Sequence, residues 1–374
     1  MTGPMWDITA LAVDAAVAGS AMVARARAAL PEAAVTVLEP EALPPPAPNG
    51  GRTLHIKAHR GRFLRPCPAT RSYRCCSYQI IHIGENCPMD CSYCILRAYF
   101  RDRTLSAFAN TEAMFDELGR IFGRDRTRTF RVGTGQFADS LALEPITGHT
   151  RELLGFLAAF DNVILELKSK TADLSWMAAD PHPDRVLPAW SLNAPAIVAA
   201  EERDTAPLTA RLAAARECVR AGFRVCLHFD PICLFPGWER GYAATVDMIF
   251  DYLRPRDIAY MSLGSFRCLP ELPGRLAAEG RAVPRYMLNE FVVGPDGKKR
   301  LLRPLRVRQF RFLVDRLAKH GFSRGLYFCM ESDEVWREVL GHTSRDMGGL
   351  APYLLDMARN RGGYRPCSWT IAKC

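Results

Sequence analysis

The chain has 374 residues, of which 48% are hydrophobic and 24% are charged. These values are typical of a folded globular protein and exclude a disordered, collagen-like or coiled-coil chain. Lys and Arg number 49 against 40 Asp and Glu, and the basic excess is concentrated in residues 51–103 and 281–320. Clustered positive charge favours a polyanionic partner such as nucleic acid.

No apolar run reaches the length of a membrane helix, and acidic residues interrupt the alanine-rich start where a signal peptide would need an apolar core. We therefore expect a cytoplasmic, monomeric protein without membrane contact. Residues 1–50 read as a small N-terminal element of strand and helix followed by a Pro-rich linker at 43–51, since Pro and Gly at that density end regular structure.

Residues 51–345 alternate between strand-length apolar runs and helical patterns. Six such units predict a parallel sheet with right-handed crossovers, and because a closed barrel needs eight, we expect an α/β fold built as a partial (β/α)6 TIM-like barrel. The predicted strands are Tyr78–Gly84, Arg128–Gly133, Asn162–Lys168, Arg185–Leu192, Phe223–Asp230 and Asp257–Leu263, and the predicted helices are Thr111–Phe122, His149–Phe160, Pro207–Ala221 and Trp238–Leu253.

The pattern then changes to a β-hairpin at 286–303, in which Gly294-Pro295-Asp296-Gly297 forms the turn. A helix at Leu305–His320, a strand at Gly325–Met330 and a short helix at Asp333–Leu340 follow. Residues 346–374 form a C-terminal tail whose last 25 residues read as loosely ordered.

Six of the thirteen cysteines lie within residues 67–94. Three of them, Cys87, Cys91 and Cys94, form a C-x3-C-x2-C loop directly after the first predicted barrel strand. Three thiolates on one short loop can hold three irons of a [4Fe-4S] cluster and leave the fourth iron open for chemistry. The alternative is a structural zinc knuckle, which needs a fourth ligand that Cys75 or Cys76 would have to supply.

This loop resembles the radical S-adenosylmethionine superfamily, in which the open iron binds S-adenosyl-L-methionine and the cofactor yields a 5′-deoxyadenosyl radical. Further blocks narrow the resemblance to the spore photoproduct lyase family. They are Tyr78–Gly84, Ala138–Glu144, Glu166–Thr171, Trp190–Asn193, Phe229–Ile232 with Gly237–Glu239, and Cys329–Ser332. The resemblance covers roughly residues 60 to 340 and implies a lyase that splits a thymine-dimer DNA lesion.

The resemblance also implies site residues. Lys170 and Ser191 match family positions beside S-adenosylmethionine, with Asn193 and Asp139 as further cofactor-binding candidates, and a cation suits the methionine carboxylate. Lys168 lies on the same face of its strand as Lys170 and stays an alternative. Tyr93, the aromatic residue before Cys94, is the candidate catalytic residue.

Two hydrogen-transfer residues of the family are absent. The cysteine that gives a hydrogen atom to the thymine radical falls at about Gln136 here, and the tyrosine after the last cluster cysteine is Ile95. Without another donor, cleavage is expected to be slow or to divert into adducts, and Gln136→Cys to restore clean thymine. The candidates for another donor are Tyr93, Cys226, Cys233 and Cys329, although packing as small buried hydrophobic residues is the favoured interpretation of the three cysteines. For Cys67, Cys75 and Cys76, a role toward a thiophilic substrate, an active-site redox role and a packing role all stay open.

The hairpin carries Lys298, Lys299, Arg300 and Arg303, and the family uses a hairpin here to grip lesion DNA, so DNA is the expected partner. A lesion must leave the duplex to reach a buried radical, which requires phosphate contacts. An electron donor such as flavodoxin or ferredoxin is also implied. Two alternatives remain: the same chemistry on a small metabolite, or a non-enzymatic zinc- or cluster-bearing nucleic-acid-binding protein.

Overall fold

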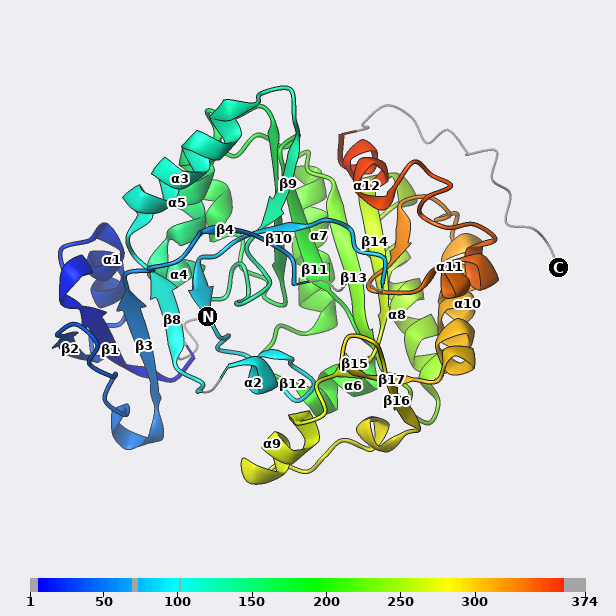
Figure 1. The fold of residues 1–374 in the computed structure, drawn as a ribbon, viewed down its shortest axis with the longest axis horizontal. Helices are drawn as coiled ribbons and strands as arrows, with labels where there is room; N and C mark the ends of the chain where they lie inside the picture. Colours follow the sequence, from blue (N-terminus) through cyan, green and yellow to red (C-terminus); the bar gives the residue numbers. More distant parts are fainter. Residues whose placement is uncertain (1–5, 69–72, 101, 360–374) are drawn as a thin grey trace.

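The computed structural model describes residues 6–68, 73–100 and 102–359. Its centre is a curled eight-stranded sheet in the order β18-β14-β13-β11-β10-β9-β5-β4 (Figure 1). Every neighbouring pair is parallel except β4 with β5, which confirms the predicted partial barrel. The strands are β4 (Leu64–Pro66), β5 (Gln79–Ile81), β9 (Phe130–Gly133), β10 (Val163–Ser169), β11 (Val186–Ser191), β13 (Val225–Ile232), β14 (Ile258–Ser265) and β18 (Leu326–Phe328).

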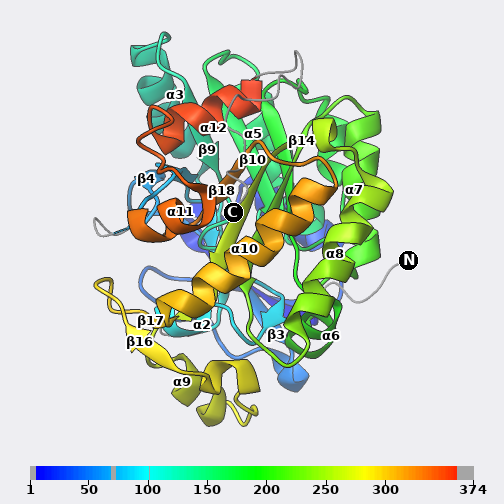
Figure 2. The ribbon, with the colours of Figure 1, turned by 90° about the vertical axis from the view of Figure 1, so that its right-hand side faces the viewer.

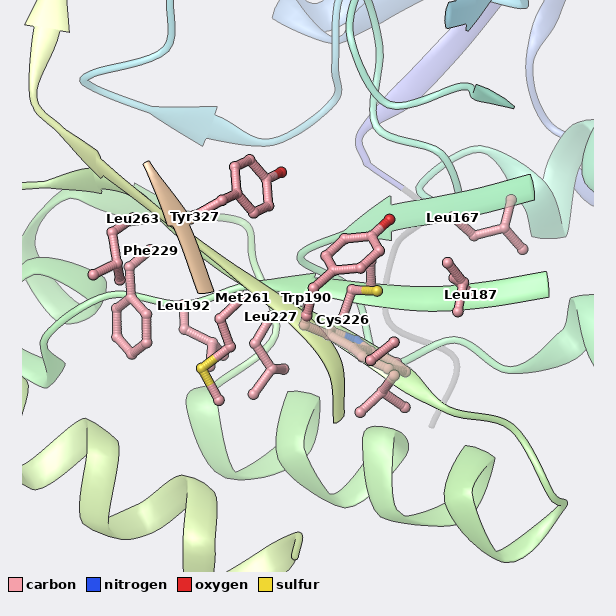
Figure 3. Close-up of a cluster of buried hydrophobic side chains, with 14 of the residues drawn as sticks. Leu167, Leu187, Trp190, Leu192, Cys226, Leu227, Phe229, Met261, Leu263 and Tyr327 are labelled. Carbon is pink, nitrogen blue, oxygen red and sulfur yellow. The ribbon is translucent and has the colours of Figure 1, made fainter. Parts of the chain in front are cut away.

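Helices cover the outer face of this sheet (Figure 2). The long ones are α3 (Thr111–Arg124), α5 (His149–Leu157), α7 (Leu208–Arg220), α8 (Trp238–Tyr252) and α10 (Arg303–Lys319); α2 (Leu96–Tyr99), α4 (Glu144–Thr147), α6 (Pro195–Glu201) and α9 (Leu272–Ala278) are short. Figure 3 shows Leu227 and Met261 pointing from the sheet toward the helices, while Tyr327 points to the opposite, inner side. Because side chains alternate along a strand, the residues between these apolar positions face the interior of the barrel.

The N-terminal residues form a second, five-stranded sheet in the order β2-β1-β3-β8-β6. It contains β1 (Ile8–Asp14), β2 (Ala34–Leu38), β3 (Arg52–Lys57), β6 (Gly84–Glu85) and β8 (Leu105–Phe108), with α1 (Ala21–Ala29) between β1 and β2. The Pro-rich segment connects β2 to β3 within this sheet. The domain boundary predicted at residue 50 therefore runs through the middle of the sheet, and β6 leads from it straight into the cysteine loop.

The predicted hairpin is present as β16 (Phe291–Val293) and β17 (Lys299–Leu301), joined by β15 (Arg267–Cys268) in a three-stranded sheet. Gly297 donates its N–H to Gly294 O and has a φ of 72°, which suits glycine at the end of the turn. Two helices, α11 (Asp333–Leu340) and α12 (Leu350–Arg359), complete the described fold. The prediction of loose order is thus wrong for residues 350–359, and residues 360–374 lie outside the described part.

Among the described residues, no helix is both long and apolar enough to cross a membrane.

Candidate active site

A cavity of about 470 Å³ occupies the inner face of the barrel, a size typical of small-molecule sites. One wall is the cysteine loop. The rest comes from the inward-facing positions of β10, β13 and β14 and from residues that follow the strand ends, where sites on parallel sheets form. They include Lys168, Lys170, Ser191, Asp230 and Cys329.

The cysteine loop brings all three predicted ligands, Cys87, Cys91 and Cys94, to this cavity. Its middle is held as a short strand, β7 (Asp90–Cys91), paired antiparallel with β12 (Glu202–Arg203). Burial raises the pKa of the Cys91 thiol to about 12, so a metal that binds there displaces a proton.

The backbone of this loop is anchored by arginines. Arg97 donates from Nε to Cys91 O at 2.9 Å and forms ion pairs with Asp90 and Glu279. Arg52 donates to Pro88 O from the N-terminal sheet. The loop is therefore fixed from both sides of the molecule, as a preorganised ligand set requires.

The zinc-knuckle alternative needs several ligands that converge on one ion. Within the described residues, no group of three Cys, His, Asp or Glu side chains is placed to hold a single ion. The three thiols nevertheless line one wall together, and a cluster whose irons each take one thiolate needs no common centre for them.

Lys170 and Ser191 both line the cavity beside the cysteine loop. Lys170 Nζ lies 5.3 Å from the centre of the Tyr93 ring and forms no ion pair or hydrogen bond with another residue of the described chain. Burial alone would lower the pKa of Lys170, but Cys91 and Glu202 outweigh it and raise this pKa. A partly buried, unpaired ammonium group is thus available to an anion in the cavity.

Tyr93 also lines the cavity, but its hydroxyl donates a hydrogen bond to Glu202. Glu202 in turn accepts from Arg211 Nη2 at 2.6 Å. This network, unnoticed in the sequence, connects α7 to the cysteine loop through β12, so the Tyr93 hydroxyl is part of the support of the loop.

Asn193 and Asp139, which were predicted to bind the cofactor, form hydrogen bonds within the protein instead. Asn193 is not among the residues that line the cavity; its amide bonds Pro231 O, Ala194 N and the Tyr242 hydroxyl. Asp139 lines the cavity, yet its carboxylate accepts from Ser169 Oγ at 2.7 Å and from three backbone N–H groups. Both side chains therefore stabilise the conformation of the loops around them.

Gln136 lines the cavity, as its predicted place after the second strand requires. Three thiols outside the cysteine loop, those of Cys67, Cys76 and Cys329, line it too, whereas Cys226 and Cys233 do not. Cys329 was among the predicted donors, whereas the sequence left Cys67 and Cys76 open between a redox or thiophilic role and packing.

The floor of the cavity is a buried polar network centred on Glu166. Its carboxylate lies 3.4 Å from His228 Nε2 and 3.5 Å from Arg131 Nη1, and it accepts from the Tyr260 hydroxyl. Burial alone would raise the pKa of Glu166, but the adjacent His228 and Arg131 side chains outweigh it and lower this pKa to about 2. The floor therefore keeps a carboxylate ionised inside the barrel.

The basic hairpin contributes less free charge than its sequence indicated. Arg300 is buried, pairs with Asp296 at 2.6 Å and stacks over the Tyr73 ring at 3.8 Å, so it is not available to a nucleic acid. Lys298 lines the cavity itself. Arg303 is exposed and Lys299 partly exposed, which leaves these two for an external partner.

The family model for spore photoproduct lyase matches residues 70–264 of this chain, just over half of its length. The chain belongs to the spore photoproduct lyase family. Curated relatives in this family include the spore photoproduct lyases of Clostridium acetobutylicum, 18% identical over 57% of this chain and 62% of the relative, and of Bacillus subtilis, 21% identical over 48% and 53%. The chain thus spans between about half and three fifths of these relatives.

Solved structures of spore photoproduct lyase share the fold. One, complexed with dinucleoside spore photoproduct, has a TM-score of 0.72 over 86% of this chain and 98% of that chain at 15% identity. A mutant with bound AdoMet and dinucleoside spore photoproduct has a TM-score of 0.71 over 87% and 99%, at 16% identity. The likeness extends well beyond the half of the chain matched by the family model.

Proposed function

We propose that this protein is a radical S-adenosylmethionine lyase that splits a thymine-dimer lesion of the spore-photoproduct type. The observation that carries the proposal is the meeting of Cys87, Cys91 and Cys94 with Lys170 and Ser191 around one cavity in a member of this family. When bound there, a [4Fe-4S] cluster and S-adenosyl-L-methionine supply a 5′-deoxyadenosyl radical.

The residues of the chain fit these groups. The three cysteines hold the cluster, the unpaired Lys170 ammonium receives the methionine carboxylate, and the Ser191 hydroxyl offers a hydrogen bond to the amine or ribose. Tyr78 lines the same cavity, and its buried hydroxyl has no hydrogen-bond partner among the described residues. A buried hydroxyl without a partner is costly, so a carbonyl of the bound lesion is its natural acceptor.

The test is anaerobic reconstitution of the full chain, followed by incubation with dinucleoside spore photoproduct and with undamaged dinucleotide. We expect only the lesion to raise 5′-deoxyadenosine formation above its uncoupled rate and to yield thymidine products. If deoxyadenosine forms but the lesion stays intact, a different substrate, such as a small metabolite, replaces this proposal.

DNA as the partner has its own test, because phosphate contacts make affinity depend on salt. Binding of a lesion-bearing duplex should weaken as salt rises, and Lys299→Ala with Arg303→Ala should flatten that dependence. Arg308→Ala is the matched control, since this exposed arginine of α10 is already paired with Glu239. Equal salt slopes in both variants would remove the hairpin from the DNA site. We also propose an electron donor of the flavodoxin or ferredoxin class as a second partner of this protein.

Replacing Lys170 by Ala should weaken S-adenosylmethionine binding roughly ten- to hundredfold while the iron content stays at the parent level. The reason is that a hydrogen bond between charged groups contributes about 1.5–3 kcal/mol. The measurement is equilibrium binding of the cofactor to the reconstituted protein. Lys319→Ala, which removes a lysine from the end of α10, should bind the cofactor as the parent does; parent-like binding by Lys170→Ala would assign the carboxylate to Lys168.

A further inference from the structure

The cavity has two sides, and the residues proposed for the cofactor occupy one of them. Lys170, just after β10, and Ser191, the last residue of β11, lie on the side of the cysteine loop. Beyond β11 in the sheet come β13, β14 and β18. These strands and the segments that follow them supply Asp230, Arg267 and Cys329 to the cavity. This second side is therefore available to the substrate.

An ion pair forms the wall of the second side. Arg267 Nη1 lies 3.1 Å from Asp230 Oδ1 and Arg267 Nη2 lies 3.3 Å from Asp230 Oδ2, so the guanidinium and the carboxylate face each other edge to edge. Gly264 on β14 makes room for this pair, because a Cβ atom there would lie 2.5 Å from Asp230 Oδ1. The Asp230 side chain is still 24% exposed and that of Arg267 15%, and since both line the cavity, one edge of the pair faces into it.

The pair keeps hydrogen-bonding capacity toward the cavity. A carboxylate has about four acceptor sites, and a guanidinium has donors on all three nitrogens. Asp230 uses two of its sites for Arg267 and one for the Cys329 thiol. Arg267 Nη2 also donates to Cys329 Sγ at 3.4 Å. An acceptor site on Asp230 and N–H groups on Arg267 therefore remain.

Lys298 adds another donor beside this pair. It directly precedes β17, in which Arg300 lies opposite Arg267 in the ladder with β15. Lys298 lines the cavity, and its ion pair with Asp296 Oδ2 is long, at 3.9 Å, because Arg300 already holds that carboxylate at 2.6 Å. Within the described part of the chain, no hydrogen bond holds Lys298 Nζ, so its N–H groups are available to a ligand.

The chemistry of this patch, formed by Asp230, Arg267 and Lys298, selects the kind of group that it can bind. A phosphate would meet the Asp230 carboxylate with like charge. A neutral imide suits the whole patch, because its N–H lies between two carbonyl oxygens. Thymine carries an imide at its Watson–Crick edge, the edge at which enzymes read a base that has left the stack. Cytosine has an acceptor nitrogen in that place and would leave the carboxylate without a donor.

We infer that Asp230 accepts the imide N–H of one thymine of the lesion and that Arg267 and Lys298 donate to its carbonyl oxygens. This inference rests on the proposed function and deepens it, since it assigns the residues that determine specificity for thymine.

The experiment measures binding to the reconstituted protein with S-adenosylmethionine but without a reductant, so that no turnover occurs. The ligands are dinucleoside spore photoproduct and two analogues, each methylated at the imide nitrogen of one thymine. The parent should bind one analogue roughly ten- to hundredfold more weakly than the lesion, because a hydrogen bond to a charged group is lost. Asp230→Ala should bind the lesion more weakly than the parent and should not distinguish it from that analogue.

Two further variants make the result specific. Asp230→Ala leaves the Arg267 charge without its partner, so Asp230→Ala with Arg267→Met removes both charges and should also bind the lesion and the analogue equally. Asp247→Ala is the matched control, because this carboxylate of α8 also pairs with an arginine, Arg316, at 3.0 Å but does not line the cavity. It should keep the parent's preference for the lesion.

Equal binding of all three compounds by the parent would overturn the inference, and so would a preference retained in Asp230→Ala or in the double variant. In either case, lesion-dependent formation of 5′-deoxyadenosine by the parent would leave the proposed function standing. A parent that neither binds the lesion nor forms deoxyadenosine in response to it would remove the proposed function, and this inference with it.

Discussion

Replacing Cys87, Cys91 or Cys94 by Ala should abolish reductive cleavage of S-adenosylmethionine, with a loss of 5′-deoxyadenosine yield on the order of 100-fold or more. Removal even of groups that only support metal ligands costs about 10- to 100-fold, and here a ligand itself is lost. All three thiols belong to one loop held between β6 and α2, so no other described cysteine of this loop can take the vacated place.

The measurements are iron and sulfide content, the absorbance of the cluster and the deoxyadenosine yield after reconstitution. Cys268→Ala is the control: this cysteine is buried, lies in β15 and does not line the cavity. We expect it to load and react as the parent does. A cysteine-loop variant that kept full iron and full deoxyadenosine would contradict the assignment of the ligands.

The barrel was predictable because its signals are local. Strands buried on both faces appear as continuous apolar runs, and those at β11 and β13 lie within two residues of their predicted bounds. The C-x3-C-x2-C spacing is also local, since a loop of eight residues brings its own ligands together.

Features that depend on contacts distant in sequence were missed. β1 pairs with β3 across the Pro-rich segment, and β3 pairs with β8 some fifty residues later; no local pattern contains that register. Asp139 and Asn193 carry the residue types of ligands, yet in the fold their polar atoms bond to backbone groups and to the Ser169 and Tyr242 hydroxyls. Cys67 and Cys76 line the cavity, a place that their position before the first barrel strand did not predict.

The last prediction concerns Arg211, a fully buried arginine of α7. It donates to Ala206 O at 2.7 Å, Ser191 O at 2.8 Å and Glu202 at 2.6 Å. Arg211→Met would leave the Glu202 carboxylate buried beside Tyr93 with much of its compensating charge removed. Breaking a buried pair in this way costs about 3–5 kcal/mol, so we expect the free energy of unfolding of the apo protein to fall by that amount.

The same helix supplies the control. Arg220 is 64% exposed and pairs with Glu217 one turn away, and an exposed pair of this kind contributes less than about 1 kcal/mol; Arg220→Met should therefore unfold at nearly the parent denaturant concentration. Since Glu202 pairs with Cys91 across β12 and β7, Arg211→Met should also retain less iron after gel filtration. Adding Glu202→Leu should recover part of the stability, because it removes the unpaired charge, but none of the iron retention. Equal destabilisation by the two arginine variants would show that the Arg211–Glu202 pair does not hold the cysteine loop in place.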